Sequence, residues 1–118
     1  MTDTPKDCYV RQVLALYRAA PGTRGRSRTA DRRLAEQLYQ DATPTDTVRA
    51  AILLTVARRL YRPDDAEPLP AINSLHYFLP VLRDIQQQPL DPDYVLYLEL
   101  KVAQATALAR ALNNHQKT

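Results

Sequence analysis

The sequence is poor in the residues that mark several common classes of protein. Its 118 residues include one cysteine, Cys8, so no disulfide can form within the chain, as is typical of a reducing compartment. There is no tryptophan, and no apolar run approaches the roughly 20 residues that a membrane-spanning helix needs. The first residues, MTDTPKDC, lack the charged and apolar regions of a signal peptide. We therefore expect a cytoplasmic protein that does not bind a membrane.

Groups suited to catalysis or metal binding are also scarce. The two histidines, His76 and His115, lie far apart in the sequence, and Cys8 has no histidine near it. The sequence has neither a glycine-rich phosphate-binding motif nor Cys/His spacing that suits zinc. We expect no enzyme, no cofactor and no bound metal.

Positive charge is concentrated in the first half of the chain. Residues 1–62 hold twelve Lys or Arg against six acids, whereas residues 63–118 hold four against seven. This polarity predicts one basic face and one neutral or acidic face. Residues 21–33, here called the arginine segment, combine both glycines with five arginines and only one acid, Asp31; these arginines are Arg24, Arg26, Arg28, Arg32 and Arg33. Guanidinium groups on such a pliable loop suit phosphate oxygens, which they grip with paired hydrogen bonds.

Helix start signals are repeated along the chain. Thr4-Pro5 and Thr43-Pro44 each place an N-cap residue before a proline at the first helical position, and Asp91-Pro92 does the same. Apolar spacing then predicts five helices, at about 5–19, 29–40, 44–61, 73–87 and 92–113. We expect an all-α fold, a single compact helical domain over residues 1–113, with a frayed tail at 114–118.

Pro80 interrupts the fourth of these helices. A proline within a helix removes one hydrogen bond, which would leave the carbonyl of His76 unpaired. The sequence therefore predicts a kink at Pro80 or two short helices in place of one.

Other residues extend the predicted phosphate-binding surface. Four arginines of the third helix and its end could broaden the basic face, although basic residues also favour helix C-termini through the helix dipole; they are Arg49, Arg58, Arg59 and Arg62. Tyr17 and Tyr39 flank the arginine segment in the sequence and are candidates to stack on unpaired bases. Such a tyrosine more commonly lies at the edge of the core, with its hydroxyl in contact with water.

The second and third helices, joined by a short connection, could form a helix-turn-helix motif. The third helix is mostly apolar between Val48 and Ala57, which leaves few polar side chains to read base edges. The pattern therefore favours contacts with the nucleic-acid backbone, or single-strand or RNA binding, over sequence reading in the major groove.

Residues 30–85 resemble a known family. A helix ending in LYQ, then VRAAILLTVARRL, a loop and INSLHYFLPVLRDI is similar to the C-terminal helical domain of DnaD-like bacterial replication proteins. The final aromatic and apolar pattern of that domain is matched by Tyr77, Phe78, Val81 and Leu82. The resemblance, shared with helical DNA-handling domains of mobile elements, implies binding of single- or double-stranded DNA. The sequence lacks the winged-helix domain that usually precedes such modules, which favours a binding subunit over replication initiation.

Together these observations predict a non-catalytic helical protein that binds the backbone of single-stranded DNA, duplex DNA or RNA through the arginine segment. The chain also resembles the small helical subunits of CRISPR effector complexes, which implies work inside a larger assembly. The alternative is a protein-interaction or dimerisation module with no nucleic-acid role. Its surface would be the last helix, where Leu96, Leu100, Ala103 and Ala107 form a second apolar row.

Overall fold

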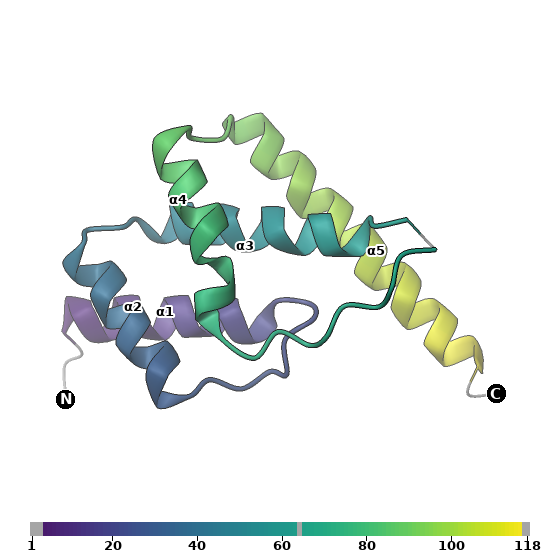
Figure 1. The fold of residues 1–118 in the computed structure, drawn as a ribbon, viewed down its shortest axis with the longest axis horizontal. Helices are drawn as coiled ribbons and strands as arrows, with labels where there is room; N and C mark the ends of the chain where they lie inside the picture. Colours follow the sequence, from purple (N-terminus) through teal and green to yellow (C-terminus); the bar gives the residue numbers. More distant parts are fainter. Residues whose placement is uncertain (1–3, 64, 117–118) are drawn as a thin grey trace.

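The computed structural model describes residues 4–63 and 65–116, with side chains as far as residue 107. This part of the chain forms five α-helices and one short 3₁₀ helix (Figure 1). In order they are α1 (Pro5–Ala19), α2 (Thr29–Gln40), α3 (Thr45–Leu60), the 3₁₀ helix η1 (Leu75–Phe78), α4 (Leu79–Gln87) and α5 (Pro92–Gln116). The predicted all-α bundle of about five helices is confirmed.

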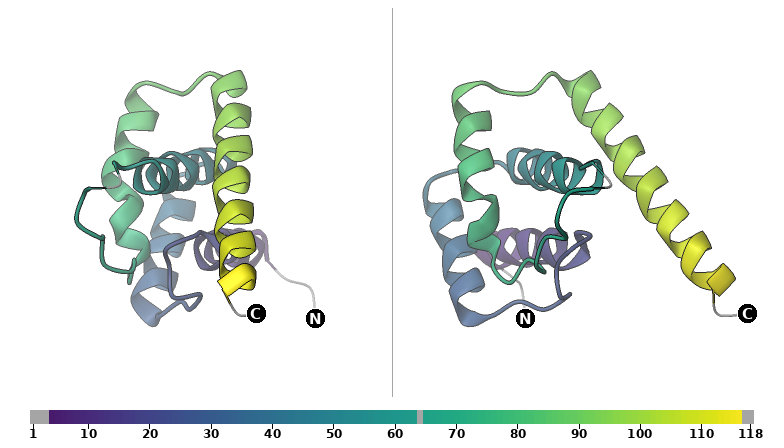
Figure 2. Two further views of the ribbon diagram at one scale, coloured as in Figure 1. Left: turned by 90° about the vertical axis from the view of Figure 1, so that its right-hand side faces the viewer. Right: turned by 45° about the vertical axis from the view of Figure 1, so that its right-hand side comes forward.

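Helix α3 is the centre of the fold. It packs against α1 on one side and against α4 and α5 on the other, and the views in Figures 1 and 2 show it enclosed by these helices. Its buried residues face several directions and include Val48, Ile52, Leu54 and Val56. A helix that is apolar on most of its circumference is stable only when neighbours cover it, and α3 meets that condition.

Helices α1 and α2 form a pair on one side of α3. The hydroxyl of Thr4 accepts a hydrogen bond from the amide of Asp7 at 3.1 Å and caps α1, as the Thr-Pro start predicted. Val10, Val13 and Tyr17 of α1 are buried. Helix α2 packs on α1 and η1.

The helix expected to be kinked at Pro80 is two short helices. Pro80 lies in the first turn of α4, where its missing N–H has no helical partner to lose. The preceding residues form η1, and the amide of Leu79 donates to the carbonyl of His76. The expectation of an unpaired His76 carbonyl is therefore wrong, because the tighter 3₁₀ turn supplies a donor.

Asp31 is buried, with 1% of its surface exposed, although it belongs to the arginine segment. One carboxylate oxygen accepts hydrogen bonds from the amide of Leu75 at 2.9 Å and the hydroxyl of Ser74 at 3.4 Å. The other accepts from the amide of Arg28 at 2.8 Å. This carboxylate joins the start of α2 to the start of η1, 44 residues further along the chain.

A second tie joins the loop after α1 to the same part of the chain. The amide of Ile72 donates to the carbonyl of Gly22 at 2.8 Å, and Thr23 and Ile72 form an isolated parallel bridge. Gly22 has a φ of 94°, a conformation that favours glycine. A Cβ at this position would lie 3.4 Å from Nε of Arg59. The local structure therefore requires a glycine here.

Helix α5 crosses α3 and then continues beyond the other helices, as the right-hand view of Figure 2 shows. Leu98 and Val102 are buried on its inner face. The helix includes residues 114–116, which the sequence predicted to belong to a frayed tail; residues 117 and 118 lie outside the described part. None of the helices that the structure describes has the length and apolar character needed to cross a membrane.

We predict that Asp31→Ala lowers the free energy of unfolding by about 3 kcal/mol, because it leaves the buried amide of Leu75 without its acceptor. Urea unfolding followed by circular dichroism measures this change. The matched control is Asp84→Asn on the exposed side of α4, which should change stability by no more than about 0.5 kcal/mol. Equal effects of the two variants would show that Asp31 does not hold the fold.

Candidate nucleic-acid interface

The arginine segment forms the loop between α1 and α2 and the first turns of α2. Arg24 and Arg26 lie on the loop, Arg28 is the residue before α2, and Arg32 and Arg33 lie near the start of that helix. All five side chains are exposed. The structure therefore brings the five predicted arginines together at one end of the α1/α2 pair.

Little negative charge opposes these arginines. Asp31, the single acid of the segment, uses its carboxylate for the internal hydrogen bonds described above. Arg32 pairs with Glu36 one turn further along α2, at 3.5 Å. Among the described residues, Arg24, Arg26 and Arg33 form no salt bridge. Their guanidinium groups are available to an external anion.

A groove beside the segment adds two arginines that the sequence reasoning missed. Arg11 and Arg18 of α1 and Arg32 of α2 line a hollow of about 340 Å³, together with Asp7, Val10 and Leu14. Nη1 of Arg18 is 3.4 Å from the hydroxyl of Ser27, which links α1 to the arginine segment. The seven-residue spacing of Arg11 and Arg18, two helical turns, was the available signal that both lie on one face of α1. We call this hollow the basic groove.

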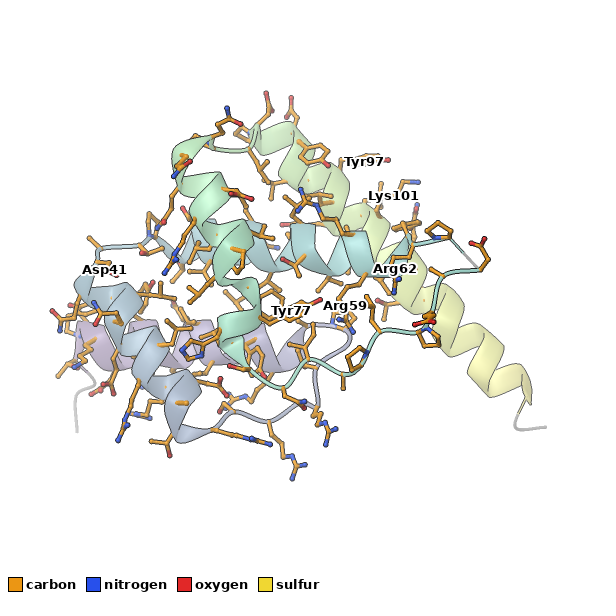
Figure 3. All side chains as sticks on the ribbon, in the orientation of Figure 1. Asp41, Arg59, Arg62, Tyr77, Tyr97 and Lys101 are labelled. Atoms are coloured by element: carbon orange, nitrogen blue, oxygen red, sulfur yellow. The ribbon has the colours of Figure 1, made fainter. Side chains whose placement is uncertain are left out.

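The arginines at the end of α3 are bound to their own chain. Arg59 donates to the hydroxyl of Tyr77 at 3.0 Å and to the carbonyl of Pro70 at 2.8 Å, and it lies over the Tyr77 ring at 5.4 Å (Figure 3). Arg62 donates to the carbonyl of Glu67 at 2.8 Å. These contacts hold the segment between α3 and η1 in place, which gives Arg59 and Arg62 an internal structural role.

Arg49 and Arg58 lie elsewhere on α3. Arg49 forms a salt bridge with Glu99 of α5, on the side of α3 that faces that helix. Arg58 is exposed and forms no salt bridge with any residue that the structure describes. Of the four arginines that the sequence proposed on α3 and just beyond its end, Arg58 is therefore the one for which the structure shows no hydrogen bond or salt bridge with the described residues.

Tyr17 cannot stack on a base, so that expectation is wrong. Only 1% of its surface is exposed, and its ring packs edge-on against Phe78 with centroids 6.1 Å apart. Burial raises the pKa of its hydroxyl, and the nearby carboxylate of Asp31 adds to this shift while Arg28 opposes it. Tyr17 belongs to the core that supports the arginine segment.

Tyr39 lies at the opposite end of α2 from the arginine segment. Arg33, the last residue of the segment, and Tyr39 are six residues apart, which corresponds to about 9 Å of helix. The Tyr39 ring contacts that of Tyr9, with centroids 5.4 Å apart. The part of Tyr39 in base stacking stays a prediction.

The geometry of α3 does not suit a helix that reads DNA. Residues Val48 to Ala57 include eight buried positions, and other helices cover them. Helix α2 packs on α1 and η1 instead of forming a two-helix unit with α3. Among the described residues there is also no group of three His, Cys, Asp or Glu that could hold a metal ion.

No family model matches this chain, and neither a curated protein nor a solved structure matches it.

We predict that Arg59→Ala lowers the free energy of unfolding by about 1–2 kcal/mol, because two hydrogen bonds and a ring contact are lost. Its neighbour Arg58→Ala is the matched control and should cost no more than about 0.5 kcal/mol. Thermal melting of both variants makes the comparison. A smaller loss for Arg59→Ala than for Arg58→Ala would refute the structural role.

A second prediction concerns alkaline pH. Tyr9 donates to the carbonyl of Thr43 at 2.6 Å, and burial, assisted by the charge of Asp41, raises its pKa from 10.0 to about 12. A raised pKa in the folded state means that the neutral hydroxyl stabilises the fold. This contribution is complete below pH 10 and is lost between about pH 10 and 12. Melting temperatures across this range should fall less steeply for Tyr9→Phe than for the unchanged protein.

The control for this experiment is Tyr97→Phe, which removes the hydroxyl group of an exposed tyrosine. If the unchanged protein and Tyr9→Phe lose stability in parallel from pH 10 to 12, the hydroxyl of Tyr9 does not carry this pH dependence.

Proposed function

We propose that the protein is a non-catalytic nucleic-acid-binding subunit that grips the phosphate backbone with the arginine segment and the basic groove. The observation that carries this proposal is the burial of Asp31, which leaves the exposed arginines of residues 21–33 with little opposing charge. Arginine is suited to this task because its planar guanidinium binds two phosphate oxygens at once.

The shape of the site supports an extended, polymeric anion. The exposed arginines run from the loop at Arg24 and Arg26 to the first turns of α2, and Arg11 and Arg18 continue the positive surface along α1. A polymer with a phosphate at every residue can contact several of these groups together. A single small anion would engage only one or two of them.

Backbone contacts fit this surface better than base reading. Exposed long cations position a nucleic acid without reading its sequence, and Tyr17 and α3 are unavailable to bases. The resemblances to DnaD-like domains and to small CRISPR subunits remain predictions about the assembly in which the protein works. That assembly would be a replication, mobile-element or RNA-guided complex. Single-stranded DNA, duplex DNA and RNA are all candidate ligands.

The alternative function is a protein-interaction module without a nucleic-acid role. It is favoured by a different surface, the outer face of α5, where Leu96 and Leu100 are 61% and 57% exposed. Binding assays with nucleic acid separate this alternative from the proposed function.

We predict that the double variant Arg24→Ala/Arg26→Ala binds labelled nucleic acid about tenfold more weakly at low salt, because two phosphate contacts are lost. The slope of log affinity against log salt should become shallower by about 2. Fluorescence anisotropy with 20-residue single-stranded DNA, duplex DNA and RNA measures both quantities and identifies the preferred polymer.

The matched control is Arg83→Ala/Lys101→Ala, which removes the same net charge from α4 and α5. Its affinity should stay within about twofold of the unchanged protein, because neither residue borders the site. Equal losses in the two double variants would show that net charge, not this site, drives binding. If the protein binds none of the three polymers at low salt, the proposed function is refuted.

A further inference from the structure

A second hollow lies where the start of the arginine segment meets the end of α3. Its volume is about 300 Å³, which suits a group about the size of one nucleobase. Pro21 and Gly22 of the arginine segment line it, with Leu60 of α3 and residues 66–69 of the connection to η1. Figure 1 shows this connection beside the loop after α1, and an isolated parallel bridge joins the two. The lining includes three prolines, Pro21, Pro63 and Pro68, and we call this site the proline hollow.

The proline hollow differs in chemistry from the basic groove. Its lining mixes apolar side chains, among them Leu60 and Leu69, with two arginines and one acid; these are Arg59, Arg62 and Glu67. Both arginines already donate to carbonyls of their own chain. The acid and the apolar walls therefore disfavour a phosphate group here. A flat, uncharged group with polar edges fits this lining better, and a nucleobase is such a group.

Polar groups at the hollow are available to the edges of a base. Nη1 of Arg62 donates to the carbonyl of Glu67 at 2.8 Å. A guanidinium has several further N–H groups, and its flat face can stack on an aromatic ring. The carboxylate of Glu67 forms no salt bridge with any residue that the structure describes. Arg62 can therefore donate to a base and Glu67 can accept from it.

The hollow is both accessible and held in place. Leu60 and Leu69 are 39% and 40% exposed, and Leu60 lies beyond the part of α3 that other helices cover. The carbonyl of Gly22 accepts from the amide of Ile72, which holds the arginine segment against the connection. Arg59 and Arg62, labelled in Figure 3, hold other parts of the same connection. A site fixed in this way loses little conformational entropy when a ligand binds.

We propose that the proline hollow binds one unpaired base of a strand whose phosphates lie on the arginine segment. The inference rests on the proposed function, because the segment supplies the phosphate contacts. Gly22 belongs to both the hollow and the segment, so a strand on Arg24 and Arg26 passes close to the hollow. A base within a duplex is paired and stacked, and it cannot enter a pocket unless it is flipped out. The preferred ligand is therefore single-stranded DNA or RNA, not duplex DNA.

A strand without bases tests the hollow in the unchanged protein. Fluorescence anisotropy compares labelled single-stranded DNA with an abasic strand of the same length, which keeps every phosphate. We expect the abasic strand to bind about tenfold more weakly, because the contact with a base is lost. The salt dependence of the two affinities should be the same, because the phosphate contacts are unchanged. Equal binding of the two strands would overturn the proposal.

Filling the hollow is the second test. Ala66→Leu adds apolar volume to its lining without changing the charge. This variant should bind single-stranded DNA about tenfold more weakly, whereas its affinities for duplex DNA and for the abasic strand should stay within about twofold. The matched control is Ala71→Leu, on the exposed part of the same connection and outside the lining. It should leave all three affinities within about twofold, and circular dichroism should show the same fold for both variants.

The outcomes separate this inference from the proposed function. If Ala66→Leu binds single-stranded DNA as the unchanged protein does, or loses as much affinity for the abasic strand, the hollow does not bind a base and phosphate binding still stands. If the unchanged protein binds no polymer, the proposed function is refuted and this inference with it. A free nucleoside monophosphate that binds as tightly as the strand, and that Ala66→Leu excludes, would indicate a nucleotide site independent of the arginine segment and would also overturn the proposal.

Discussion

The carboxylate of Asp31 is the constraint on which the arrangement of the molecule depends. The segment between α3 and η1 returns across the fold with little regular structure, so specific hydrogen bonds must fix its path. Asp31 accepts from the amide of Leu75 near the end of this segment and from the amide of Arg28 at the start of α2. The carbonyl of Gly22 accepts from the amide of Ile72 in the same segment. The part of the arginine segment between Gly22 and Arg28 is therefore tied at both of its ends to residues 72–75.

This double tie affects binding as well as folding. A loop with fixed ends loses less conformational entropy when it binds than a free chain would, so more of the contact energy appears as affinity. Residues between the two ties, including Arg24 and Arg26, stay exposed. The internal use of Asp31 also removes the one negative charge of the segment from the surface. Folding and the positive charge of the proposed site thus depend on the same side chain.

The sequence alone was sufficient to predict the helices, but it was insufficient to predict the roles of single side chains. Proline starts and apolar spacing are local signals, and they predicted α1 and α2 at the bounds observed. The partners of Asp31 lie 43 and 44 residues away, so no local pattern could have shown that it is buried. The burial of Tyr17 did have a local signal, because Tyr17 continues the apolar spacing of Val10, Val13 and Leu14 on one face of α1. Arg11 and Arg18 could have been found from their helical spacing, which places both on one face of α1.

The argument that placed α3 at the centre applies also to α5. A helix with apolar residues on most of its circumference needs neighbours on most of its circumference, and α3 has them within the chain. Helix α5 is similarly apolar on two sides, yet α3 covers only the inner one.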